Sequence, residues 1–240
     1  MVIKSIQKKE KVTDQVFSAI KDLLMRGDLK PGDKLPAVNE MAEKMGVGIS
    51  SVLVAVKMLE TLGAVEARQG EGTFVCTELK EGVANALGIQ FLLLPQSAEY
   101  LVQFREMYET AYTHMAMDNA TSEDLAEIEK IVMALEDRVR KESQDTLVEA
   151  QDELDFHMSV LRCTHNPYII KIGEASLELF FEVMHSKIRP LKLIEAAMDH
   201  RNIYLSLLNK DTELLKKVFV KSFGGWRDRF KAYVNDENKK

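Results

Sequence analysis

The sequence predicts a mostly α-helical chain with one small β-hairpin near its N-terminus. Over most of the 240 residues, apolar side chains recur three and four positions apart, which is the spacing of one helix face. Alternation with a period of two begins after Gly63, next to turn-forming glycines. These observations predict an N-terminal part, residues 1–77, and an all-α antiparallel bundle of about seven helices, residues 81–240.

The first predicted helix runs from Lys11 to Arg26. Its apolar residues form one stripe, as in an amphipathic helix, and Gly27 ends it. The run from Gly27 to Pro36 is rich in Gly, Pro and Asp. We therefore expect turns there, closing with a short strand.

Two short helices come next and are separated by a glycine-bearing turn. Met41, Ala42 and Met45 share one face of a helix that must stop at Gly46, and the helical pattern restarts over Ile49–Leu62. Two short helices joined by a sharp turn are the sequence form of a helix-turn-helix.

The residues after Gly63 predict a hairpin. Gly70 and Gly72 supply a tight turn between the expected strands Ala64–Arg68 and Thr73–Val75. Helix, turn, helix and hairpin in this order predict a winged helix-turn-helix, a fold that places its second helix in the major groove of DNA.

Composition limits the class of protein. The chain is 46% hydrophobic and 29% charged, enough to bury one or two cores, and its net charge of −6 means that any contact with nucleic acid is local. Cys76 and Cys163 stand in no metal-ligand spacing, which predicts free thiols in a reducing compartment. No apolar run approaches the roughly 20 residues that span a bilayer, and no signal-peptide pattern begins the chain. We expect a cytoplasmic protein without a membrane partner.

The part after Lys80 shows helical patterns only. Thr121–Asp124 resembles a capping box ahead of one helix. Short turns between the segments favour one antiparallel bundle. The predicted helices are Glu81–Leu94, Ala98–Asn119, Leu125–Lys141, Asp145–Thr164, Pro167–Ile188, Leu191–Asn209 and Asp211–Val234.

One group of residues in the bundle has metal-binding chemistry. Glu153 and His157 are four positions apart and project from the same helix face, while His200 comes from a later helix. A carboxylate with imidazoles is a typical ligand set for a transition metal. The alternative is that Glu153 and His157 form a surface pair, or a pair that supports a site without binding its ligand.

Three stretches of the N-terminal part resemble GntR-type bacterial transcription regulators. They are Gly-Asp-Leu-Lys-Pro-Gly-Asp-Lys-Leu-Pro from residue 27, Glu-Met-Ala-Glu-Lys-Met-Gly-Val from residue 40 and Gly-Glu-Gly-Thr-Phe-Val from residue 70. The resemblance extends over residues 10 to 77 without a gap. It implies a winged domain that binds double-stranded operator DNA.

Several arginines that the family uses on DNA are replaced here. Asn39, Ile49 and Leu53 stand where arginine is usual, and Glu71 replaces a basic wing residue. With fewer phosphates neutralised, we expect binding that is weaker and less salt-sensitive. An alternative is that Ile49 and Leu53 pack inside a domain that has lost its operator. The resemblance leaves these DNA-binding candidates: Asn39, Lys44, Ser50, Ser51, Lys57, Arg68, Gln69, Gly70 and Gly72.

The bundle resembles the effector-binding FCD domain of the FadR subfamily. The matching stretches are Glu153–His157, Asn166–Pro167, Asp199–Ile203 and Asp211. In that domain an Asp and three His hold a divalent metal. Glu153 stands at the Asp position, His157 and His200 match, and Ser222 aligns with the third His.

The same resemblance implies a small organic acid as effector. Arg105 matches an arginine near the effector pocket, and Arg162 and Asn166 are further candidates. The alternative for Arg105 is an ion pair with Glu109 or Glu153. The metal that the resemblance implies is a zinc-like ion, although some members of the subfamily bind their effectors without a metal.

We therefore expect a homodimeric, ligand-controlled transcription factor rather than an enzyme. One alternative is a metal-dependent hydrolase in which Glu153, His157 and His200 activate a water. Another is a protein-interaction module that no longer reads an operator. The remaining rings, for which we expect capping, surface or packing roles, are His114, His165, His185, Trp226, Phe180 and Phe181.

Overall fold

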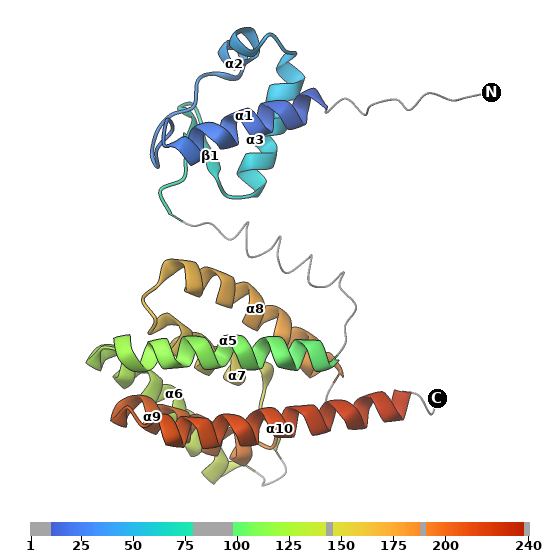
Figure 1. Cartoon of the computed structure of the whole chain (residues 1–240). Helices are drawn as coiled ribbons and strands as arrows, with labels where there is room; N and C mark the ends of the chain where they lie inside the picture. The colour runs from blue at the N-terminus through green and yellow to red at the C-terminus, as the bar shows by residue number, and fades with distance from the viewer. Residues whose placement is uncertain (1–10, 79–97, 143–145, 188–190, 238–240) are drawn as a thin grey trace, which may run out of the picture. The chain divides into compact units, whose positions relative to one another are not determined.

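A computed structural model of the chain describes residues 11–78, 98–142, 146–187 and 191–237 (Figure 1). These residues fold into two compact units, one before and one after residues 79–97 in the sequence. The described ranges contain nine helices and one two-stranded sheet, so the chain is mostly α as predicted. The helix expected over Glu81–Leu94 lies outside the described residues.

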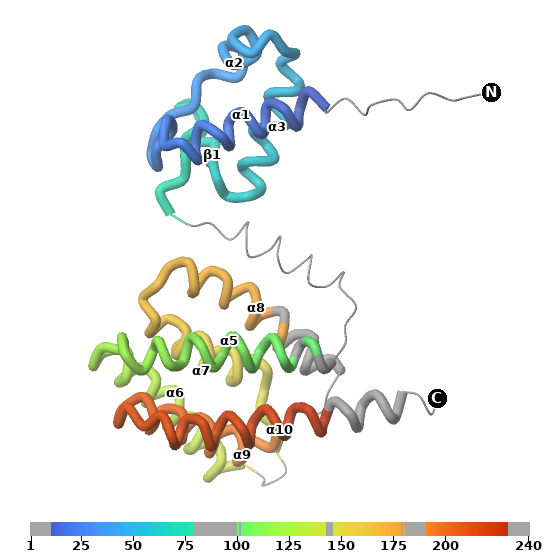
Figure 2. Tube along the Cα trace, viewed as in Figure 1, coloured from blue at the N-terminus to red at the C-terminus, as the bar shows by residue number. Residues whose placement is uncertain are grey.

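The N-terminal unit is a helix-turn-helix followed by a wing (Figure 2). Helices α1 (Val12–Arg26), α2 (Val38–Met45) and α3 (Ile49–Thr61) precede the antiparallel strands β1 (Val65–Arg68) and β2 (Gly72–Val75). The strands pair with Val65 opposite Val75 and Arg68 opposite Gly72. The short strand expected before α2 is a single bridge between Lys34 and Phe74.

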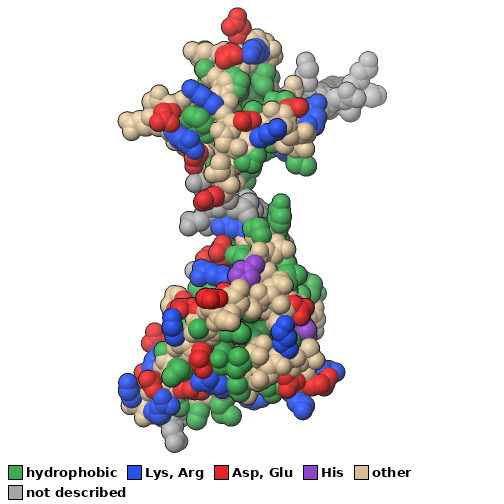
Figure 3. All heavy atoms as spheres, turned by 90° about the vertical axis from the view of Figure 1, so that its left-hand side faces the viewer, with side chains coloured by type: hydrophobic (Ala, Val, Ile, Leu, Met, Phe, Trp, Pro, Cys, Tyr) green, Lys and Arg blue, Asp and Glu red, His purple; other side chains and the backbone are tan. Residues whose placement is uncertain are grey.

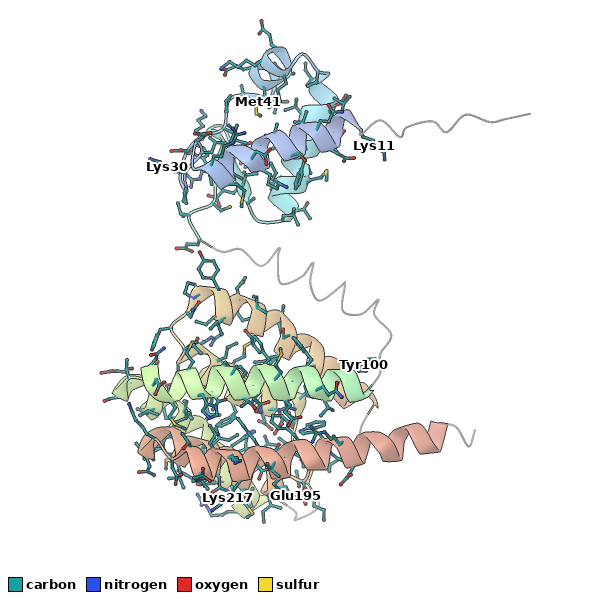
Figure 4. All side chains as sticks on the ribbon, viewed as in Figure 1. Lys11, Lys30, Met41, Tyr100, Glu195 and Lys217 are labelled. Atoms are coloured by element: carbon teal, nitrogen blue, oxygen red, sulfur yellow. The ribbon has the colours of Figure 1, made fainter. Side chains whose placement is uncertain are left out.

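One apolar core holds this unit together. Helix α1 packs on α3, and Met41, labelled in Figure 4, points inward from α2. Gly46 ends α2 at φ 65°, a left-handed conformation that glycine adopts without steric cost, and so makes the turn into α3 possible. The buried residues are Val16, Ile20, Leu35, Met41, Ala42, Val52, Ala55, Val56, Leu59, Val65 and Val75.

The C-terminal unit is a bundle whose six described helices surround an apolar core. They are α5 (Ala98–Asn119), α6 (Ser122–Lys141), α7 (Ala150–Arg162), α8 (Pro167–Lys187), α9 (Leu193–Asn209) and α10 (Thr212–Glu237). Helix α5 lies antiparallel to α10, α6 packs on α9, and α7 packs on α8 (Figure 1). None of the described helices is both long and apolar enough to cross a membrane.

Helix α7 begins later than the sequence predicts. The expected helix starts at Asp145, but the peptide N–H of Val148 donates to Leu191 O, and that of Leu193 donates to Thr146 O. These hydrogen bonds hold residues 146–148 in an extended bridge, so α7 starts at Ala150. Helix α6 starts at Ser122, where the capping box of Thr121 and Asp124 is present as predicted.

Candidate functional sites

The residues that the resemblance assigns to DNA lie on the surface of the N-terminal unit. Most of these side chains and glycines are exposed, and Ser51 is half-buried. Ile49 and Leu53 are 54% and 59% exposed, so the alternative that they pack inside the domain is wrong. Gly72 adopts φ 116° at the tip of the wing, where a β-carbon would lie 2.8 Å from the Lys34 side chain. Glycine at this position therefore allows the turn between the two wing strands to form.

The basic residues on this surface lie next to acidic ones. Lys44 Nζ lies 2.7 Å from Glu40, and Lys57 Nζ lies 2.8 Å from Glu60. Arg68 also has an acidic partner, Glu66, and its guanidinium covers the Phe74 ring at 4.4 Å. Lys/Arg and Asp/Glu side chains lie side by side on the face of the unit in Figure 3. Such exposed pairs are weak and exchange partners readily, so these cations can turn to phosphates.

The predicted metal ligands come together in the core of the C-terminal unit. Glu153 and His157 project from α7 and His200 from α9, and all three side chains are buried. One ligand atom from each lies within 4.8 Å of the others. The alternative of a surface pair is therefore wrong for Glu153 and His157. Ser222, at the position of the third histidine, is half-buried on α10.

Charged and polar side chains of helix α5 contact this cluster. Arg105 Nε donates to Glu109 Oε2 at 2.7 Å, and Arg105 Nη2 lies 3.0 Å from His157 Nε2. His157 Nδ1 lies 3.1 Å from Glu109 Oε1 and 3.4 Å from the Tyr112 hydroxyl. The ion pair between Arg105 and Glu109, one of the alternatives from the sequence, is thus present.

These contacts assign one protonation state to His157. Because Glu109 accepts and the Arg105 guanidinium donates, His157 carries its proton on Nδ1 and a lone pair on Nε2. Burial lowers the pKa of His157, which favours this neutral ring. Burial alone would raise the pKa of Glu109, but Arg105 and His157 outweigh it and bring the pKa to about 2.

Glu153 is the second buried carboxylate of the cluster. Burial alone would raise its pKa, but His200, His157 and Arg105 together outweigh burial and bring the pKa to about 2. His200 Nε2 lies 3.2 Å from Glu153 Oε1, but the alignment is not that of a hydrogen bond. Glu153 Oε1 and His200 Nδ1 are therefore buried without a hydrogen-bond partner. His200 is held in place by stacking on Phe156, with ring centroids 3.8 Å apart.

A second guanidinium, which sequence reasoning missed, lies near the cluster. Arg229 covers the Trp226 ring at 4.4 Å, and Arg105 lies 5.1 Å from the same ring. The Nε and Nη2 atoms of Arg229 are buried without a hydrogen-bond partner. Burial lowers the pKa of Arg229 despite the nearby Glu153. Arg229 follows Trp226 by three positions, which places both on one helix face, and this spacing was the sequence signal that could have indicated their contact.

Arg162 and Asn166 are not brought to the cluster. Arg162 is exposed at the end of α7, and the Asn166 side chain accepts from the peptide N–H groups of Tyr168 and Ile169 at the start of α8. Tyr112, which contacts His157, was missed, although Arg105, Glu109 and Tyr112 repeat at positions i, i+4 and i+7 of one helix face.

The other rings have the structural roles expected of them where their side chains are described. His114 contacts Thr110 O on its own helix, and His165 pairs with Asp124 at the surface. Phe180 and Trp226 are buried and pack edge to face. The side chains of Phe181 and His185 lie outside the described residues.

Two family models match the two units. The model of bacterial regulatory proteins of the gntR family matches residues 12–75, and the FCD domain model matches residues 100–221. The second match alone spans half of the chain. The chain belongs to the GntR family of transcription regulators and carries an FCD domain.

Individual GntR-family relatives agree with this assignment. The Uxu operon transcriptional regulator of Escherichia coli is 26% identical over 97% of this chain and 92% of its own length. LutR of Bacillus subtilis is 29% identical over 68% of this chain and 72% of its own. A GntR structure from Streptococcus agalactiae aligns with a TM-score of 0.60 at 19% identity, covering 90% of this chain and 99% of that one, which shows the shared fold.

The GntR and FCD assignments decide the broad function. The protein is a DNA-binding transcription regulator with an effector-type helical domain, because GntR regulators bind operators and FCD domains bind small-molecule effectors. The matched domains and relatives are transcription regulators, so the expectation that the chain is not an enzyme is confirmed and the hydrolase alternative is wrong.

Proposed function

We propose that a small organic acid, bound beside a zinc-like metal in the FCD domain, controls the operator affinity of this regulator. The observation that supports this is the buried group of Glu153, His157 and His200, whose ligand atoms lie within 4.8 Å of one another. Burying a carboxylate oxygen without a hydrogen bond is costly, so the arrangement calls for a positive partner.

The donor set fits such an ion. One carboxylate and two imidazoles suit a divalent transition metal, with positions left open for water and an effector carboxylate. Glu109 accepts from His157 Nδ1, and a carboxylate in this place orients a ligating imidazole and makes it more basic. When bound, the metal would supply positive charge that attracts an acid. Glu153, His157 and His200 would hold it.

Arg105 is the residue that we assign to the acid. In the described structure its Nη2 lies against His157 Nε2, the nitrogen that would face a metal. For Nε2 to serve as a ligand, the guanidinium would have to turn away, and it would then be available for a bidentate contact with a carboxylate. Arg229, whose buried Nε and Nη2 have no hydrogen-bond partner, is a second candidate for this contact.

The small space beside Arg105 supports a mechanism in which the effector rearranges the bundle. The cavity there measures about 10 Å³, room for no more than a single water. Tyr108 and Phe180 line it, so an acid of several heavy atoms has to displace side chains between α5 and α8. We propose that this repacking is the change that couples effector binding to DNA binding. A coupling of about 1–3 kcal/mol is sufficient for such a switch.

We also propose that the regulator is a homodimer. A helix-turn-helix protein reads a symmetric operator most simply as a two-fold dimer, with half-sites about one helical turn apart. Light scattering of the purified protein tests this directly. A mass equal to one chain for the purified protein at micromolar concentration would contradict it.

One experiment tests the effector and metal proposals together. The full-length protein is used to select duplexes from a random pool, and the selected operator is titrated by fluorescence anisotropy with and without zinc and short carboxylic acids. We expect an acid to change the affinity of the zinc-loaded protein by 5- to 150-fold. The double variant His157→Ala/His200→Ala should lose both stoichiometric zinc and this response. The matched variant His114→Ala should keep both.

The outcomes separate the parts of the proposal. An affinity that no acid changes removes the switch, and a response that survives chelation removes the metal from it. Failure to enrich any duplex would instead favour the protein-interaction module considered from the sequence.

A further inference from the structure

The outward face of α3 is apolar where a surface helix is normally polar. The helix buries Val52, Ala55 and Leu59 against the core, but it exposes Ile49 and Leu53 on the other side. More than half of each of these two side chains is accessible. Exposed apolar side chains that adjoin one another mark a surface that contacts something.

The first two turns of α3 lack the side chains that read guanine or adenine. Residues 49–56 contain no Arg, Lys, Asn or Gln, and their polar side chains are the hydroxyls of Ser50 and Ser51. Bidentate contacts to guanine come from Arg or Lys, and those to adenine come from Asn or Gln. The next cation, Lys57, lies two turns along the helix and pairs with Glu60.

The position of these turns determines which bases they meet. In a helix-turn-helix, the N-terminal residues of the second helix contact base edges in the major groove. Ile49 opens α3, and Leu53 follows one turn later on the same side of the helix. In this docking geometry both side chains would meet base edges.

Thymine is the base that such side chains can distinguish. Its C5-methyl group is the apolar feature of the major-groove edge, and aliphatic side chains recognise it by direct contact. We infer that Ile49 and Leu53 read thymine methyl groups in each operator half-site and so help to set its sequence. This inference rests on the operator binding tested above and adds the base that is read.

Two exposed lysines of the helix-turn-helix are available to contact DNA phosphates. Lys44 and Lys57 have side chains that are 68% and 74% exposed, and their acidic partners hold them only through exposed ion pairs. Phosphates compete well for such lysines. An apolar helix face in a unit that also carries exchangeable cations suits a duplex, whose groove edge carries methyl groups between two phosphate chains.

The test replaces thymine without changing base pairing. The operator selected by the full-length protein is resynthesised with deoxyuridine in place of each thymine in turn, which removes only the methyl group. At the contacted positions we expect the wild-type affinity to fall about fourfold for each methyl lost. Ile49→Ala and Leu53→Ala should each bind the thymine operator more weakly, and each should lose the response to uracil at one position. Met25→Ala, which truncates an exposed apolar side chain on α1, should behave as wild type.

Each result decides the inference. Equal wild-type affinity for the thymine and uracil operators overturns it while leaving operator binding intact. A uracil effect of the same size in the Ile49→Ala/Leu53→Ala double variant also overturns it, because the effect then comes from the DNA itself. If no duplex is enriched in the selection, operator binding by this chain and the inference both fail.

Discussion

The guanidinium of Arg105 lies against the imidazole of His157, with Nη2 and Nε2 3.0 Å apart. Glu109 supports both residues, since it accepts from Arg105 Nε and lies 3.1 Å from His157 Nδ1. A divalent ion held by His157 Nε2, as we propose, would require the lone pair that the guanidinium now contacts. This competition between the chain's own cation and the proposed metal yields the first two predictions.

Replacing Arg105 should strengthen metal binding and weaken acid binding. Arg105→Met keeps much of the side-chain volume but removes the charge that competes for His157 Nε2. We expect zinc affinity, measured by competition with a chromophoric chelator, to rise about tenfold, the value of one charged hydrogen bond. Acid binding, measured by calorimetry, should be lost. A fall in zinc affinity in a variant with wild-type circular dichroism would contradict this prediction.

Glu109 should influence the metal without touching it. Glu109→Gln weakens the acceptor for His157 Nδ1–H and so makes Nε2 a poorer ligand. Loss of a supporting carboxylate of this kind typically costs 10- to 100-fold in metal affinity, and we expect a change in that range. Glu136→Gln, which removes a carboxylate bound to Arg201 outside the cluster, is the control. Equal zinc affinities for the two variants would show that Glu109 has no such role.

Because Glu136 pairs with Arg201, the free energy of unfolding should depend on pH in the acid range. Arg201 donates to both carboxylate oxygens, at 2.7 and 2.6 Å, and these hydrogen bonds hold the pKa of Glu136 below its ordinary value. A lowered pKa in the folded state contributes stability above the unfolded-state pKa, and this contribution is lost as the pH falls through the folded-state pKa. Urea unfolding from pH 7 to pH 3 should therefore show Glu136→Gln less stable than wild type at neutral pH, with the difference shrinking in acid. Glu178→Gln, an exposed position on α8, should show no such trend.

Two glycines in the bundle should respond oppositely to alanine. At Gly173 a β-carbon would lie 2.5 Å from Leu161 Cδ2 and 3.0 Å from Tyr108 Cε1, and the fully buried Leu161 has little room to move. We expect Gly173→Ala to lower the free energy of unfolding by about 1–3 kcal/mol through overpacking. A β-carbon added at Gly224 on α10 would have no neighbour within 4 Å. Gly224→Ala should therefore raise the free energy of unfolding by up to about 1 kcal/mol through helix propensity. Urea midpoints measure both, and an unchanged midpoint for Gly173→Ala would show that α7 and α8 pack less closely.

The sequence by itself determined the elements and the type of each unit. Helical spacing, the stop at Gly46 and the turn glycines at 70 and 72 are local features, and they specify helix, turn and hairpin before any long-range contact forms. The same spacing placed Glu153 and His157 on one face, where the structure has them.

Only the tertiary structure decided which partners these residues meet. Packing of α5 against α7 and α9 brings Arg105, Glu109 and Tyr112 to His157, and the course of α10 brings Arg229 near Glu153. The structure also decided between the two alternatives for Ile49, because an apolar residue at helical spacing looks the same whether its face is covered or open. Side-chain partners depend on contacts between segments far apart in the chain, and local periodicity carries no information about them.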